Sequence, residues 1–140
     1  SGVSSATDAD LPAVQGVRGM LGEVFGLTDT VRASMLVNKL LSKARVQPRL
    51  TDHDGYQWHM HYFVPGASLA EHLALEGGMA LAHVITADQL DRLRVCEAPD
   101  CTSVLVDMSR NRSKRYCDAQ ACGNRLHVAA YRERKRAELA

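Results

Sequence analysis

The positions of the four cysteines restrict the fold of this 140-residue chain more than any other feature. They form two Cys-x4-Cys pairs, Cys96 with Cys101 and Cys117 with Cys122, separated by fifteen residues. A structural Zn²⁺ ion is closed by four tetrahedral ligands, which are often thiolates. Each short spacing can hold two sulfurs on one side of an ion, and the longer arm carries the chain to the other side. The spacing therefore predicts one zinc ion with four cysteine ligands.

Two disulfide bonds in a secreted domain are the alternative explanation for four cysteines. Secreted domains held together by disulfides are usually shorter than this chain, and thiols in the cytosol stay reduced. We therefore expect thiolates on zinc. The ion should be structural, because four thiolates leave no open coordination position for water.

Charge is distributed unevenly along the chain, although the totals of 17 basic and 16 acidic residues nearly balance. Residues 1–91 hold 6 Lys/Arg and 10 Asp/Glu, whereas residues 92–140 hold 11 Lys/Arg and 6 Asp/Glu. A basic half indicates an anionic partner. No apolar run reaches 18 residues and no signal peptide is visible. We therefore expect no membrane span and a cytoplasmic location, at the nucleoid if the partner is DNA.

The first 91 residues have the pattern of a small helical domain with a β-hairpin. Apolar residues recur at helical spacing from Leu11 to Val24 and from Val31 to Leu41. Segments 45–51 and 56–64 alternate as strands, and a Ser68–Glu71 capping box predicts a third helix.

Two details of this part concern packing. Along the second strand, Tyr56, Trp58, Met60 and Tyr62 share one face, which we expect to be the core face, with the histidines opposite. The glycines at 16, 19 and 22 predict close approach of another backbone, and Gly77-Gly78 predicts a kink or break in the third helix.

The cysteine region has the pattern of a compact metal module. A knuckle at 96–101 precedes a strand at 103–107, a polar turn at 109–113 and a returning strand at 114–117. A helix from 121 to 139 carries the last ligand. The whole chain is therefore predicted to be α+β, a helical domain with a hairpin followed by a treble-clef-like zinc finger. The module has few large apolar side chains, so it should unfold without metal.

A family resemblance follows from residues in and around the cysteines. Cys122-Gly123-Asn124-Arg125 reproduces the signature of the CGNR zinc finger, and residues 92–140 are similar to that family. Residues 1–91 resemble the C-terminal part of the ABATE domain, with a shortened N-terminus. The resemblance implies a DNA-binding transcriptional regulator linked to stress. The other matching residues are Arg92, Arg94, Cys96, Cys101, Asp107, Ser109, Asn111, Ser113, Arg115, Cys117, Tyr131 and Arg132.

Basic residues form two clusters that suit a polyanion. Clustered Lys and Arg donors match phosphate oxygens and concentrate positive potential. The C-terminal dipole of a helix also favours cations, which explains the second cluster but not the first. We therefore expect both clusters, together with Arg125, to contact nucleic acid. The clusters are Arg110, Arg112, Lys114 and Arg115, and Arg132, Arg134, Lys135 and Arg136.

The signature residues beside the last cysteine have structural interpretations too. Gly123 can let the backbone pass close to the zinc cluster. We expect Asn124 to support the metal site. Arg125 can either contact nucleic acid or hydrogen-bond the knuckle or an acid such as Asp107.

Four other hypotheses remain open. The finger could bind RNA or a protein instead of DNA, and the chain could form a homodimer or bind another protein. His59 and His61, with Asp52, His53 and Asp54 nearby, could form a second metal or hydrolytic site. We expect these histidines to line a polar outer face instead, and we expect no enzymatic activity. His127 could replace a thiolate, but four cysteines already close the site.

Overall fold

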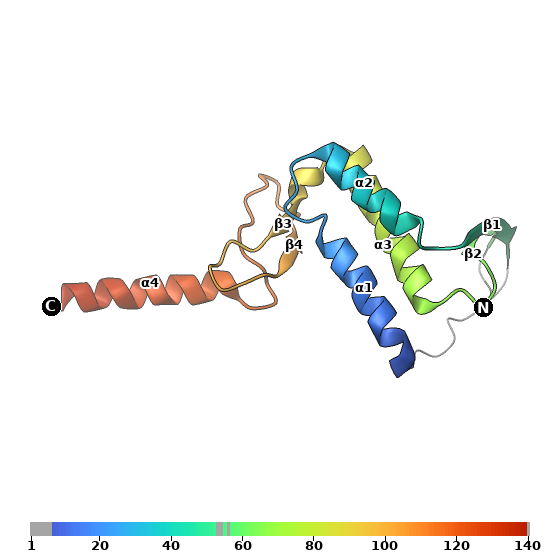
Figure 1. Cartoon of the computed structure of the whole chain (residues 1–140). Helices are drawn as coiled ribbons and strands as arrows, with labels where there is room; N and C mark the ends of the chain where they lie inside the picture. The colour runs from blue at the N-terminus through green and yellow to red at the C-terminus, as the bar shows by residue number, and fades with distance from the viewer. Residues whose placement is uncertain (1–6, 53–54, 56, 140) are drawn as a thin grey trace. The chain divides into compact units, whose positions relative to one another are not determined.

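The computed structural model describes residues 7–52, 55 and 57–139. It confirms the α+β architecture, with N-terminal helices and a hairpin followed by a four-cysteine cluster, a second hairpin and a C-terminal helix (Figure 1). The chain divides into two compact units. The first comprises Ser1–Val24 and Asp29–Asp88, and the second comprises Phe25–Thr28 and Gln89–Ala140.

Three helices form the body of the first unit. They are α1 (Leu11–Gly22), which follows a short 3-10 turn at Asp8–Asp10, α2 (Thr30–Leu41) and α3 (Leu69–Thr86). Helix α3 packs against both α1 and α2, as the ribbon shows (Figure 1). The Ser68 capping box is confirmed at the start of α3. The buried side chains of these helices are Val17, Ala33, Val37, Leu40, Ala74 and Leu81.

The glycines of this unit act differently from the prediction. Gly77 and Gly78 do not interrupt α3, which is continuous from Leu69 to Thr86. A Cβ atom on Gly77 would lie 2.7 Å from Leu21, and one on Gly78 would lie 2.7 Å from Leu41. The two glycines therefore admit leucines of α1 and α2 to the surface of α3. At residues 16, 19 and 22 a Cβ would meet no neighbouring atom of the described chain within 4 Å, so the predicted close approach is wrong.

A two-stranded hairpin connects α2 and α3. Strand β1 (Val46–Thr51) pairs antiparallel with β2 (His59–Phe63). The Arg45 guanidinium, just before β1, donates from Nε to Glu71 Oε1 at 2.7 Å. This ion pair ties the start of the hairpin to the first turn of α3.

The hairpin presents the opposite face to the one predicted. Trp58, Met60 and Tyr62 are 67%, 44% and 41% exposed, whereas His59, His61 and Phe63 are half-buried. The Phe63 ring stacks on the His72 imidazole of α3, with centroids 3.6 Å apart. Ring stacking against α3 therefore selects the face with the histidines. Tyr56, also predicted to be in the core, lies outside the described residues.

The second unit contains the cysteines. A short 3-10 turn (Leu90–Arg92) leads into strand β3 (Leu93–Val95), which pairs antiparallel with β4 (Val104–Val106). The segment Phe25–Thr28 joins this unit, and Gly26 N donates to Leu93 O at 2.8 Å. Helix α4 (Cys122–Glu138) agrees with the predicted helix. No helix in the described part of the chain is both long and apolar enough to cross a membrane.

The predicted returning strand at 114–117 is wrong. These residues form no strand, and the partner of β4 is β3, so the knuckle lies at the tip of the hairpin. Residues 107–114 instead form a compact loop. The Lys114 N–H donates to the Asp107 carboxylate, and Arg92 and Arg94 donate to carbonyl oxygens of the loop.

Close helix packing at Gly78 can be tested by adding a side chain there. We expect Gly78→Val to lower the free energy of unfolding by about 1–3 kcal/mol, because the new methyl groups would overlap Leu41. Gly19→Val is the matched control on an exposed helix surface, and we expect it to be neutral or slightly stabilising. Urea unfolding measures both variants. Equal effects would contradict the packing role of Gly78.

Candidate metal centre and nucleic-acid interface

The four cysteine sulfurs lie together as one cluster. Every Sγ atom is within 4.8 Å of the other three. The Cys117 sulfur is 3.7 Å from the sulfurs of both Cys101 and Cys122. Tetrahedral zinc with bonds of about 2.3 Å places sulfurs about 3.8 Å apart, whereas a disulfide joins them at about 2.05 Å. The distances between the sulfurs therefore match a zinc site. All four cysteines are free thiols, so none of them forms a disulfide.

Each ligand is held by a different part of the second unit. Cys96 follows β3, and its N–H donates to Ser103 O at 2.9 Å. Cys101 closes the knuckle by donating to Ala98 O at 3.1 Å. Cys117 ends the loop after β4 and donates from its N–H to Cys96 Sγ at 3.4 Å. Cys122 is the first residue of α4, where the positive end of the helix dipole favours a thiolate.

The surroundings of the thiols affect their acidity in opposite directions. Hydrogen bonds from the Ser103 hydroxyl and N–H lower the pKa of Cys101 to about 6. Burial raises the pKa of Cys122 to about 12 in the absence of metal. Because zinc binds the thiolate, it must displace the proton of Cys122, and metal binding will release protons at neutral pH.

Four clustered cysteines in this arrangement indicate one zinc ion. Within the described ranges, no other group of three or more His, Cys, Asp or Glu side chains brings its ligand atoms together. His59 and His61 therefore belong to no such group among the described residues. His53 and Asp54, which belonged to the alternative metal-site hypothesis, lie outside the described residues.

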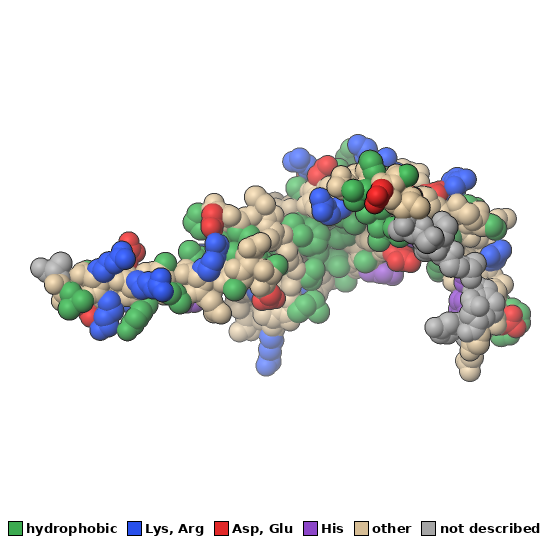
Figure 2. Space-filling view, turned by 90° about the horizontal axis from the view of Figure 1, so that it is seen from below, with side chains coloured by type: hydrophobic (Ala, Val, Ile, Leu, Met, Phe, Trp, Pro, Cys, Tyr) green, Lys and Arg blue, Asp and Glu red, His purple; other side chains and the backbone are tan. Residues whose placement is uncertain are grey.

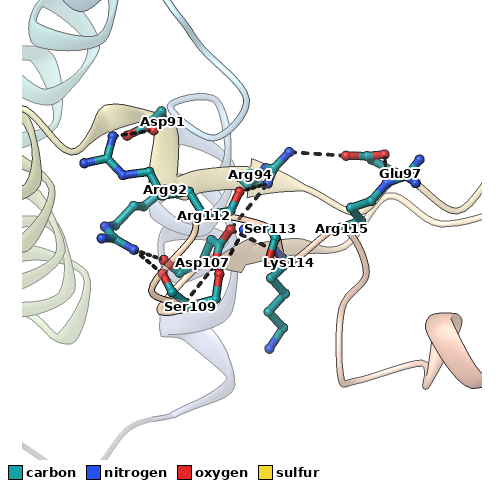
Figure 3. A network of polar contacts seen from close by, with 10 residues as sticks. All are labelled: Asp91, Arg92, Arg94, Glu97, Asp107, Ser109, Arg112, Ser113, Lys114 and Arg115. Atoms are coloured by element: carbon teal, nitrogen blue, oxygen red, sulfur yellow. Dashed lines mark hydrogen bonds and ion pairs between the residues drawn. The ribbon is translucent and has the colours of Figure 1, made fainter.

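A buried carboxylate organises the loop between β4 and Cys117. Asp107 is 0% exposed and accepts from Ser109 Oγ at 2.6 Å, from Ser109 N at 2.9 Å and from Lys114 N at 2.9 Å (Figure 3). Arg94 Nη1 adds a fourth contact at 3.3 Å. These hydrogen bonds, the Ser109 hydroxyl first, lower the pKa of Asp107 to about 2 against the effect of desolvation. The carboxylate is therefore ionised at neutral pH.

Two arginines brace the same loop through its carbonyl groups. Arg92 Nη1 donates to Asp107 O at 2.7 Å and to Ser109 O at 3.0 Å. Arg94 Nη1 also donates to Arg112 O at 3.1 Å (Figure 3). The sequence analysis did not predict this role for Asp107. An acid two residues before a serine is a known signal for local side-chain-to-backbone turns and could have indicated it.

The first predicted basic cluster, here called the loop cluster, lies between β4 and Cys117. It consists of Arg110, Arg112, Lys114 and Arg115, and most of these residues form ion pairs. Arg112 pairs with Asp91 at 2.7 Å, and Arg115 pairs with Glu97 at 2.7 Å (Figure 3). The Lys114 ammonium pairs with Asp118. Arg110 is exposed and makes no ion pair within the part of the chain that the structure describes.

Arg125 links the last helix to the knuckle. Its guanidinium donates to both carboxylate oxygens of Asp100, at 3.0 and 2.9 Å, and its Nη2 atom lies 3.5 Å from Cys122 Sγ. This geometry favours the supporting role, with Asp100 as the acid in place of Asp107. Asn124, expected to support the site, is exposed and has no side-chain hydrogen bond among the described residues. A Cβ atom on Gly123 would lie 3.5 Å from the Tyr116 ring, an ordinary contact.

The last helix carries the basic residues with the fewest internal partners. All residues from His127 to Leu139 are exposed, and Figure 2 shows Lys and Arg side chains along this helix at the left of the view. Lys135 pairs with Glu138 at 3.1 Å. Arg132, Arg134 and Arg136 make no ion pair with any described residue.

One face of α4 combines basic and small side chains. Arg132 and Arg136 lie one turn apart, at helical spacing from Arg125, Val128 and Ala129. A groove of about 380 Å³ runs along this face. Its lining residues are Ala121, Asn124, Arg125, Val128, Ala129 and Arg132.

Removal of the metal should unfold the second unit and spare the first. The sulfurs join four separate segments, and the unit has only a small apolar core around Ala98 and Leu105. After chelation we expect amide hydrogens of β3, β4 and α4 to exchange rapidly while those of α3 stay protected. Hydrogen exchange with and without zinc measures this. Retained protection of the Leu105 amide without zinc would contradict it.

The two roles of arginines on α4 can be separated by matched substitutions. Arg125→Ala should weaken zinc affinity about 10–100-fold, because it removes the guanidinium that contacts both Asp100 of the knuckle and the Cys122 sulfur. Arg132→Ala, two turns further along the same face, should leave zinc affinity unchanged. Competition with a chromophoric chelator measures both, and equal zinc affinities for the two variants would contradict the supporting role of Arg125.

Comparison with known proteins agrees with this site. The family model of the CGNR zinc finger matches residues 92–135, which include all four cysteines, Asp107 and Arg125. The ABATE domain was not detected in the first 91 residues. No curated protein matches the chain. The chain therefore carries a CGNR zinc finger at residues 92–135.

Proposed function

We propose that the chain is a transcriptional regulator that binds DNA through its zinc finger, with α4 as the main contact. The observation that carries this proposal is the exposed face of α4, where Arg132 and Arg136 have no internal acidic partner. Guanidinium groups donate to phosphate oxygens and, in the major groove, to guanine. Zinc holds the first residue of this helix in the finger, so the metal would position the contact.

The dimensions and exposure of α4 suit a groove of duplex DNA. The major groove admits an α-helix, and isolated helices shorter than about 12–15 residues are marginally stable in water. The exposed part of α4, which begins at His127, falls in this range. Within the second unit α4 extends away from the β3–β4 hairpin (Figure 1). Val128 and Ala129 are small, so a helix using this face could approach base edges closely. A partner that covers the face would stabilise the helix.

The loop cluster contributes less in this proposal than the sequence predicted. Arg112, Lys114 and Arg115 each have an acidic partner within the finger. An exposed ion pair contributes only about 0–1 kcal/mol to stability. These side chains can therefore exchange a carboxylate for a DNA phosphate, but the exchange adds little binding free energy. Arg110 is the exception, since it is exposed and unpaired among the described residues.

We further propose that the first unit senses a signal or mediates assembly, and that the protein acts in the cytoplasm at the nucleoid. Homodimerisation would raise the affinity of a single short finger by presenting two contacts to one duplex. Catalysis has no place in the proposal, because four thiolates leave no open position on the zinc.

An RNA or protein partner is the alternative function. The finger also exposes apolar side chains, with Met108 at 81% and both Val104 and Val106 at 43%. Apolar surface of this kind is typical of protein contacts. A protein partner held by this surface would bind with little dependence on salt.

The DNA proposal predicts a strong and specific salt dependence. If about four phosphates are neutralised, duplex affinity should fall ~100-fold between 50 and 200 mM salt. The double substitution Arg132→Gln with Arg136→Gln should reduce the salt slope by about 2, because two phosphate contacts are lost. Fluorescence anisotropy with labelled duplex DNA measures both quantities.

The matched control replaces Arg112 and Arg115 by Gln, which removes the same charge from residues already paired with Asp91 and Glu97. We expect this variant to change the slope by less than 1. Equal slopes for all three zinc-loaded proteins would contradict a contact through α4. Displacement of the duplex by equimolar RNA would favour the RNA alternative.

A further inference from the structure

The first unit contains a cavity between β2 and α3. Its volume is about 520 Å³, within the range of small-molecule sites. Every residue of β2 borders it on one side, and four residues on one face of α3 border it on the other. The lining residues are His59, Met60, His61, Tyr62, Phe63, His72, Leu75, Glu76 and Met79.

The lining combines apolar surface with a few polar groups. Met60, Phe63, Leu75 and Met79 provide the apolar part, and the methionine side chains can adapt to the shape of a bound molecule. The imidazole rings of His59 and His61 lie side by side, with centroids 5.1 Å apart. His59 Nδ1 lies 2.8 Å from the Gln57 carbonyl oxygen, which holds that ring in one orientation.

The two walls of the cavity differ in charge. In the hairpin, Arg49 lies directly opposite His61, and Thr51 lies opposite His59, so these side chains share a face of the sheet. Arg49 has no acidic partner among the described residues. The helix wall carries a carboxylate instead, Glu76. An anionic group would therefore be attracted to the hairpin wall and repelled from the helix wall.

We propose that this cavity binds a small carboxylic acid with an aromatic or aliphatic body. The carboxylate would accept a hydrogen bond from the imidazole of His61, near the Arg49 guanidinium, because the N–H of a neutral His59 ring is already donated to the Gln57 carbonyl oxygen. The hydrocarbon body would lie against Phe63, Leu75 and Met79. Glu76 sets the orientation by excluding the carboxylate from the helix wall.

Within the described residues, the side chains that line this cavity do not form a metal site. Among the described side chains, His59, His61, His72 and Glu76 do not bring three ligand atoms close enough to share an ion. The apolar part of the lining would also contribute nothing to metal binding. An organic acid uses both parts of the cavity.

The test uses three probes that share a naphthalene body and differ in charge. They are 2-naphthoate, 2-naphthalenemethanol and 2-naphthylmethylammonium, titrated into the zinc-loaded full chain by calorimetry. We expect one saturable site for naphthoate, with about tenfold weaker binding of the alcohol and still weaker binding of the ammonium, because charge-assisted hydrogen bonds are lost.

Matched variants locate the site. Leu75→Trp fills the cavity and should abolish naphthoate binding, whereas Leu73→Trp adds the same ring on an exposed part of α3 outside the lining and should not. His61→Gln should weaken naphthoate binding about tenfold. Glu76→Gln should preserve or strengthen it. Circular dichroism and zinc content show whether each variant is folded.

Three results would overturn the inference. Preference for the ammonium probe would make Glu76 the anchor and exclude an acid. Unchanged naphthoate binding by folded Leu75→Trp would place the probe elsewhere. Absence of binding by the folded wild-type chain at millimolar concentration would show that the cavity does not take this class of molecule. None of these results bears on DNA binding by α4, so the two proposals fail separately.

Discussion

Coordination of four thiolates by one zinc ion is the interaction on which the second unit depends. The ligands come from the end of β3, the knuckle, the end of the loop after β4 and the first residue of α4. Few apolar side chains accompany them, chiefly Ala98 and Leu105. A structural zinc site supplies on the order of 10–16 kcal/mol of apparent binding energy in peptides, which exceeds what so small a core provides. The metal therefore acts as the core of the finger.

The buried Asp107 carboxylate is a second, electrostatic centre of this unit. Several basic residues near it make contacts within the finger. Arg94 bonds to the Asp107 carboxylate, and Arg92 to the Asp107 carbonyl (Figure 3). Pairs such as Arg115 with Glu97 add to the same network. A cluster of arginines beside a metal site is thus not by itself a nucleic-acid surface. What distinguishes α4 is that Arg132 and Arg136 are exposed and form no ion pair with any residue of the described chain.

The first unit offers a different chemistry. Its hairpin turns histidines and Phe63 toward α3, and this orientation creates the cavity, with His59 and His61 on the hairpin wall and Glu76 on the helix wall. The proposed acid site and the proposed DNA contact thus belong to separate compact units. A chain that carries both would suit a regulator that responds to a small molecule.

Local spacing was sufficient to predict the elements that depend on it. The four cysteine ligands, the capping box at Ser68 and the last helix all follow from short-range patterns, because metal ligation and helix capping involve residues close in sequence. Tertiary structure alone decided the contacts between distant segments. Pairing of β4 with β3, the use of Gly78 to admit Leu41, the contact of Arg94 with Asp107 and the choice of hairpin face each depend on a partner from another segment of the chain. Strand alternation divides β2 into two faces, but only the ring of His72 on α3 determines which face turns inward.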